Sequence, residues 1–260
     1  MDQGGGNALE KENTAPSEKR AIEEKKQDAY SVLRRDIVEL RLKPGTIVSI
    51  RDLCDHFHSS RSPMRDALIR LGEEGLVDLL PQRGIMISRI DIDRVEEERF
   101  LRVSVERNVM QMFQAQHTPE DIAFLQACIV RQKRSISTGD YRANIALDDE
   151  FHRYFYQVTG KTLCADVIWK ASGHYSRVRL LTCVDRDISE EITNQHCDFV
   201  EAIGKGDEAG VLAVFNHHLS KIDAEESMLS AKYPDLFLQN KATARKDDLL
   251  KDDFLETLKE

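Results

Sequence analysis

The sequence lacks the features of a membrane protein or of a disulfide-stabilised secreted protein. None of its apolar runs approaches the roughly 18 residues that a membrane-spanning helix needs. Its start has no apolar signal core, and its five cysteines form no Cys-x-x-Cys pair. We therefore expect a cytoplasmic protein without a membrane partner. The cysteines are Cys54, Cys128, Cys164, Cys183 and Cys197.

Several enzyme motifs are also missing from the chain. It has no Gly-x-Ser-x-Gly nucleophile elbow, no His-Glu-x-x-His zinc motif and no glycine-rich phosphate loop. Each of these motifs supplies groups that hydrolysis or phosphoryl transfer requires. Their absence leads us to expect a protein that is not an enzyme.

The composition that remains is that of an ordinary globular protein, with 41% hydrophobic and 32% charged residues in a chain of 260. This length favours two domains. Residues 1–25 have almost no large apolar side chain, which predicts a disordered tail. Residues 26–90 mix helical and strand-like patterns, whereas residues 91–232 keep a helical period throughout. Residues 233–260 form a charged tail.

Residues 50–77 predict a helix-turn-helix. Ile50–Phe57 is amphipathic, and a short turn at residues 58–60 joins it to a second helix. We place the start of that helix at Ser62-Pro63, because serine can cap a helix and proline costs nothing at its first position. Arg61 and Arg65 lie away from the apolar stripe of this helix.

A hairpin with a basic tip follows the second helix. Residues 76–80 and 85–88 are short apolar runs on either side of Pro81-Gln82-Arg83-Gly84. Other helices are expected over residues 29–40, 93–115, 119–137, 141–159, 161–182, 189–203 and 207–230. The fold class is therefore mainly α, with an N-terminal winged helix-turn-helix that carries a small β-hairpin and a C-terminal antiparallel all-helical bundle.

The first part of the chain resembles the GntR family of bacterial transcription regulators. The resemblance rests on Pro44-Gly45, on Ser60 to Leu68, on Glu74 to Val77 and on Arg83-Gly84, which agree in order and spacing. It implies a module that binds double-stranded operator DNA. Residues 26–90 hold 11 Lys and Arg against 9 Asp and Glu, so the net charge of −9 comes from elsewhere in the chain. Acidic surfaces there disfavour binding to bulk DNA.

The expected DNA contacts follow from the winged module. Arg61 and Arg65 are one turn apart and suit guanine edges in the major groove. The resemblance implies a phosphate contact for Arg34, and the wing tip is expected against the minor groove. A homodimer on a palindromic operator is expected, because one such module reads only a short half-site. The predicted DNA-binding residues are Arg34, Ser60, Arg61, Ser62, Arg65, Arg83 and Gly84.

The second part, over about residues 91–230, resembles the C-terminal ligand-binding (FCD) domain of the FadR subfamily of GntR regulators. This resemblance implies an all-helical domain that binds a small effector. The matching residues are Arg102, Glu106, Asp148, Phe151, His152, Gly160, His196, Ala202, Ile203, Gly206, Asp207, His218 and Leu219.

Helix geometry places four candidate metal ligands at the edges of buried helix faces, and the resemblance to the subfamily supports one common site. Asp148 and His152 are four residues apart and share one face. His196 lies about 50° from the centre of its apolar stripe and His218 about 80°, whereas His217 faces outward. Three imidazoles and a carboxylate suit zinc, nickel, manganese or iron, and the imidazole count does not select among them; zinc or nickel is the first choice. The alternative is three polar histidines at the edge of the core, each satisfied by a neighbour.

Arginines near such a metal could bind the carboxylate of a small organic acid. Arg102, Arg177 and Arg179 are the candidates, although each could equally form a surface salt bridge. These features favour a repressor that a small carboxylic acid, bound at the metal, releases from DNA. One alternative is a metal-dependent hydrolase fused to a DNA-binding domain. Another is a dimerising DNA binder without an effector.

Overall fold

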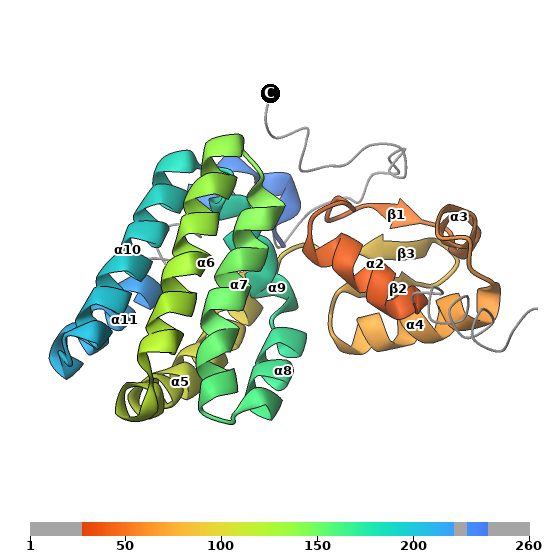
Figure 1. Cartoon of the computed structure of the whole chain (residues 1–260). Coiled ribbons are helices and arrows are strands. Elements are labelled where there is room, and N and C mark those ends of the chain that lie inside the picture. Colours follow the sequence, from red (N-terminus) through yellow and green to blue (C-terminus); the bar gives the residue numbers. More distant parts are fainter. Residues whose placement is uncertain (1–27, 221–227, 239–260) are drawn as a thin grey trace, which may run out of the picture.

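The computed structural model describes residues 28–220 and 228–238, which form two units joined near residue 90 (Figure 1). The expected N-terminal tail at residues 1–25 lies outside the described residues, as does most of the expected C-terminal tail. The predicted fold class is confirmed. The first unit contains α2 (Ala29–Val38), β1 (Ile47–Val48), α3 (Ile50–His56), α4 (Arg61–Glu73), β2 (Val77–Leu80) and β3 (Gly84–Ile87).

The second unit is helical in its described part (Figure 1). Its α6 packs between α7 and α10, and α10 packs on α11. Phenylalanines dominate its core, with Phe113, Phe151, Phe155 and Phe199 all buried. The helices are α5 (Ile92–Gln116), α6 (Pro119–Thr138), α7 (Tyr141–Val158), α8 (Thr162–Ala171), α9 (Gly173–Thr182), α10 (Arg186–Gly204) and α11 (Glu208–Ser220).

Helix α4, the second helix of the helix-turn-helix, begins two residues before its predicted start. Ser60 is its N-cap and Arg61 its first residue, so Pro63 lies within the first turn. The prediction of Ser62 as the cap was wrong by two residues. The first turn tolerates proline throughout, because its N–H groups have no partner inside the helix. Gly75 ends the helix in the left-handed conformation, at φ +71°.

The wing is a three-stranded antiparallel sheet in the order β1-β3-β2, where the sequence predicted only a hairpin. Strand β1 has two residues, too few for an alternating pattern to be visible in the sequence. Gly84 adopts φ +115°, and a Cβ atom there would lie 2.6 Å from the carbonyl oxygen of Val48. The close approach of β1 to β3 therefore requires glycine at this position.

We expect Gly84→Ala to lower the free energy of unfolding by about 2 kcal/mol or more, since it combines backbone strain with a clash against backbone. Urea unfolding of the full chain measures this. The exposed neighbour provides the control, because Arg83→Ala should change stability by less than about 0.5 kcal/mol. Equal stabilities for the two variants would show that the wing does not need glycine here.

Helices α8 and α9 form a corner where the sequence predicted a single helix over residues 161–182. The helix breaks at Ser172, whose buried hydroxyl donates to the carbonyl oxygen of Ile168 at 2.6 Å. Gly173 then passes against Leu76 of the first unit, and a Cβ atom at Gly173 would lie 2.7 Å from Leu76 Cδ2. The prediction of one continuous helix was wrong because the break allows Gly173 to contact Leu76, a residue almost one hundred positions away in the sequence.

A separate apolar cluster fills the junction between the two units. It brings together Leu40 from the end of α2, Ile90 from the connection and Tyr175 from α9. Phe237 joins the same cluster and pairs with Ile90 in a parallel bridge. Leu236 and Phe237 are therefore buried at this junction, although the sequence assigned residues 233–260 to a charged tail. No helix in the described residues is long and apolar enough to cross a membrane.

Candidate metal centre and nucleic-acid interface

The outer face of α4 presents its basic side chains to solvent. Arg61 and Arg65 are exposed, as are Ser60 and Ser62 at the start of the helix. The opposite face is buried in the core of the first unit through Met64, Ala67, Leu68 and Leu71. Arg83 is exposed at the wing tip. These side chains are thus free to approach a duplex from one side.

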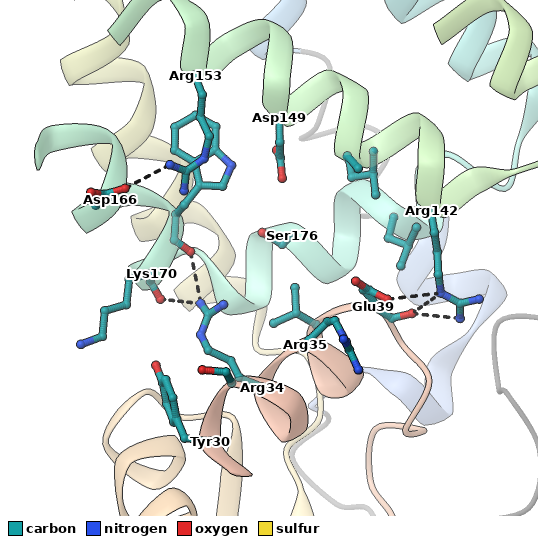
Figure 2. Close-up of a pocket in the computed structure, with 16 residues that line it drawn as sticks. Tyr30, Arg34, Arg35, Glu39, Arg142, Asp149, Arg153, Asp166, Lys170 and Ser176 are labelled. Carbon is teal, nitrogen blue, oxygen red and sulfur yellow. Dashed lines mark hydrogen bonds and ion pairs between the residues drawn. The ribbon is translucent and has the colours of Figure 1, made fainter. Parts of the chain in front are cut away.

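Arg34 is the exception among the predicted DNA contacts. Its Nη2 donates to the carbonyl oxygens of Trp169 at 3.2 Å and Lys170 at 2.7 Å, at the C-terminal end of α8 (Figure 2). Its Nε donates to Glu74 at 2.8 Å. The expected phosphate contact is therefore a contact between the two units in this conformation. The sequence could not show this, because the accepting carbonyls belong to the second unit.

The structure brings the four predicted metal ligands together from α7, α10 and α11. One candidate ligand atom from each of Asp148, His152, His196 and His218 lies within 4.8 Å of the others. Asp148 Oδ1 is 3.4 Å from His196 Nε2, and Asp148 Oδ2 is 3.9 Å from His152 Nε2. This spacing is short enough for a single ion to contact all four.

Helix α11 places the half-buried His218 on the face that meets the core, although the stripe differs from the predicted one. The predicted stripe included Leu212, but that side chain is 40% exposed, whereas Val211 and Phe215 are buried. His218 follows these two at helical spacing and so lies on the same face. His217 is exposed, as expected.

Each of the three histidines is held through its Nδ1 atom by an oxygen acceptor. His152 Nδ1 contacts Glu106, His196 Nδ1 lies 3.0 Å from Gln132 Oε1, and His218 Nδ1 lies 2.9 Å from Gln195 Oε1. Carboxylate and amide oxygens only accept hydrogen bonds, so each Nδ1 carries a proton, and in a neutral imidazole the Nε2 then keeps a free lone pair.

Those lone pairs point to the centre of the cluster. The Nε2 atoms of His152 and His196 are buried and have no hydrogen-bond partner in the described part of the chain. Unpaired buried nitrogens are costly unless a ligand satisfies them. This arrangement, with Nδ1 anchored and Nε2 presented inward, is the one that metal-binding histidines adopt. The residues present therefore fit a divalent metal.

Electrostatics favour the protonation states that a metal requires. Burial lowers the pKa of His196 to about 3, even though Asp148 raises it. Burial also lowers the pKa of His218 well below its usual value, and the other two histidines add to this effect. For Asp148, burial raises the pKa, but Arg179 and the neighbouring histidines outweigh it and keep the carboxylate charged. Neutral imidazoles beside an ionised carboxylate can bind a cation without first losing protons.

The acceptors behind the histidines form a second layer that sequence analysis largely missed. Glu106 matched the family pattern, but nothing in the sequence connected Gln132 with His196 or Gln195 with His218. Glutamines at helical positions are common, and only the packing of α6, α10 and α11 shows which ones reach a histidine.

We expect Gln132→Leu to weaken metal binding by about 10- to 100-fold, because His196 would lose the contact that orients its ring. Isothermal titration of the metal-free protein with Zn²⁺ measures the affinity. Gln126→Leu, on an exposed position of the same helix, is the matched control and should bind Zn²⁺ like the wild type. Equal Zn²⁺ affinities for the two variants would show that Gln132 does not contribute to metal binding.

Two of the three predicted ligand-binding arginines border the centre. Arg102 is buried and donates through Nε to Glu106 at 2.9 Å, beside the anchored His152. Arg179 contacts Asp148 directly and lies 2.8 Å from Asp149 Oδ1. Both guanidinium groups therefore lie beside the cluster, each paired with a carboxylate of this region.

Arg177 bonds residues away from the centre, so the structure gives no support to its prediction as a ligand-binding residue. It is buried and donates to the carbonyl oxygen of Ser88 at 2.6 Å, at the end of the wing. Arg177 and Arg179 are two positions apart on α9, about 200° around the helix, so they point in nearly opposite directions. Because of this spacing, only one of the two arginines can point toward the metal centre.

The comparisons with known proteins agree with this division into two units. Residues 25–87 match the family described as bacterial regulatory proteins, gntR family, and residues 99–221 match the FCD domain. An uncharacterised HTH-type transcriptional regulator in an unstable DNA locus of Streptomyces ambofaciens is 30% identical over 218 residues, 84% of this chain and 92% of that protein. The HTH-type transcriptional repressor RspR of Escherichia coli K12 is 29% identical over 211 residues, 81% of this chain and 92% of that protein.

Solved structures show the same fold at lower sequence identity. McbR/YncC of Escherichia coli superposes with a TM-score of 0.65 at 17% identity, covering 79% of this chain and 96% of that one. A putative transcriptional regulator GntR from Rhodococcus sp. RHA1 also gives a TM-score of 0.65, at 18% identity over 80% of this chain and 99% of that one.

Proposed function

This chain belongs to the GntR family of bacterial regulatory proteins, which are DNA-binding transcription regulators and not enzymes, and on that premise we propose a metal-dependent, ligand-released repressor. A divalent metal is held by Asp148, His152, His196 and His218, and a small organic acid binds at its open positions. Binding of that acid lowers the affinity of the protein for its operator. The protein acts in the cytoplasm, where its operator DNA is.

The observation that carries this proposal is the pair of unpartnered Nε2 atoms at His152 and His196. A cluster of histidines satisfied by its neighbours would show both ring nitrogens paired, and these rings show only Nδ1 paired. Three nitrogens and one oxygen favour zinc or nickel. The bound metal supplies a positive centre for a carboxylate oxygen, and Arg102 and Arg179 supply charge-assisted hydrogen bonds to the rest of the acid.

Repression and dimerisation have separate support. The relative from Escherichia coli is named a repressor, which favours the same direction of regulation here. A palindromic operator would require a homodimer, because a two-fold protein matches a two-fold site. Two strongly exposed apolar side chains, Phe100 on α5 at 74% and Leu163 on α8 at 75%, lie on helices that contact each other. They offer apolar surface for a second copy.

The test is a screen of the purified full chain with small carboxylic acids, with Zn²⁺ present or removed by chelation. An effector should raise the melting temperature only when Zn²⁺ is present, because ligand binding stabilises the folded state. The same acid should then release the protein from an operator selected out of random duplexes, by about 5- to 150-fold in affinity. An acid that stabilises the chelated protein equally well, or that leaves operator affinity unchanged, would contradict the proposal.

A further inference from the structure

We propose that the α8–α9 corner, which we define as residues 169–174, couples occupation of the metal centre to the position of helix α4. The inference rests on the proposed function and adds to it the route by which the centre would act on DNA binding. It follows from two contacts at the end of α4 and from the other end of α9, which reaches a metal ligand.

The first contact joins the last turn of α4 to the end of α8. Glu74, the C-cap of α4, accepts hydrogen bonds from Arg34 Nε at 2.8 Å and from the hydroxyl of Tyr30. Arg34 then donates to the carbonyl oxygens of Trp169 and Lys170, as Figure 2 shows. These carbonyls lie at the negative end of the α8 dipole, where a cation is stabilised. Arg34 therefore connects α4 to the corner through charged hydrogen bonds.

The second contact reaches the end of α4 from the other side of the corner. His174 Nδ1 accepts from the backbone N–H of Asp91 at 3.0 Å, so its Nε2 carries the proton and donates to the carbonyl oxygen of Gly75 at 3.0 Å. Burial and the nearby Arg177 lower the pKa of His174 to about 3, which keeps the ring neutral. One imidazole thus ties the end of α4 to the start of α5.

The far end of α9 reaches the metal centre. Arg179 contacts Asp148, a proposed metal ligand, and shares its guanidinium with Asp149. A metal would draw an oxygen of Asp148 toward itself, so the position of Arg179 depends on whether the centre is occupied. Arg179 is rigidly connected to His174 through less than two turns of helix. A shift of α9 at one end is therefore a shift at the other.

A cleft beside the first contact leaves room for α2, on which α4 packs, to move. The cleft in Figure 2 has a volume of about 480 Å³ and is lined by α2 on one side and by α7, α8 and α9 on the other. At this cleft the two units meet through individual side chains such as Arg34, whereas the apolar junction cluster packs them together elsewhere. A packed interface would resist small displacements, whereas a cleft bridged by single hydrogen bonds permits them.

Hydrogen–deuterium exchange of the full chain, with Zn²⁺ alone as the probe, tests this coupling. In the wild type, Zn²⁺ should slow exchange around residues 148–152 and should also change exchange over residues 70–78 by at least about 5-fold, the lower end of usual coupling. Arg34→Met and His174→Phe, which break the two contacts separately, should reduce the change at 70–78 to less than about 2-fold. Both variants should keep the Zn²⁺ effect at 148–152.

Arg35→Met is the matched control, because Arg35 is the neighbour of Arg34, lines the same cleft and bonds Asp36 within its own unit. It should respond like the wild type. If His174→Phe fails to fold, Arg34→Met alone still measures whether the exchange change at residues 70–78 depends on these contacts. If Zn²⁺ slows exchange at residues 148–152 of the wild type but does not change exchange at residues 70–78, the coupling is refuted while the proposed metal centre is supported. Wild-type responses in both contact variants would also overturn it. Loss of the Zn²⁺ effect at 148–152 itself would instead refute the proposed centre.

Discussion

Replacing His196 and His218 together with alanine is expected to abolish stoichiometric metal binding and the response of the operator complex to an organic acid. The two imidazoles come from α10 and α11 and supply half of the four candidate ligands. Changing one residue behind a ligand already costs about 10- to 100-fold in affinity, so loss of two ligands should cost more than about 100-fold. Elemental analysis after dialysis against a low Zn²⁺ concentration measures the retained metal.

His217→Ala is the control for this experiment, because His217 is exposed on the same helix and next in sequence to His218. It should retain one metal per chain and the full response. Circular dichroism tests whether the double variant is folded, since it removes the unpaired Nε2 of His196 but leaves that of His152 buried. A folded double variant with stoichiometric metal would show that these histidines are not the ligands. One without metal but with a normal acid response would show that the metal is not the anchor of the effector.

Replacing Arg65 with alanine is expected to lower the preference for the specific operator over random duplex by about 5- to 150-fold. Arg65 is exposed on the outer face of α4, one turn from Arg61, and a bidentate contact to guanine discriminates by about 1–3 kcal/mol. The affinity for random duplex, which depends on phosphate contacts, should change far less. Titration of both duplexes at one salt concentration measures the ratio.

Arg186→Ala is a suitable control for charge alone, because Arg186 is exposed on α10 of the helical unit and pairs with Glu190. It removes one positive charge without touching the winged unit, so the ratio should stay as in the wild type. If Arg65→Ala weakens the specific and random duplexes equally, Arg65 contacts a phosphate and reads no base.

The sequence by itself determined where most of the helices run, although not the break at Ser172, and which four residues are the candidate ligands. Both depend on local rules. Helical spacing places Asp148 and His152 on one face, and the apolar stripes of α10 and α11 show that His196 and His218 point inward. A residue on the buried face of a helix must meet the core, so these conclusions needed no knowledge of which helices become neighbours.

Only the tertiary structure decided what each of these faces meets. Arg34 bonds carbonyl groups more than 130 positions away, and the break at Ser172 lets Gly173 pass against Leu76. Periodicity shows that a side chain is buried or exposed, but its partner is set by the packing of distant segments. The same limit explains why Gln132 was missed behind His196 and why Arg177 was assigned to the ligand and not to Ser88. Local sequence therefore specifies the candidate ligands of the centre, and long-range packing specifies how the centre is connected to the DNA-binding unit.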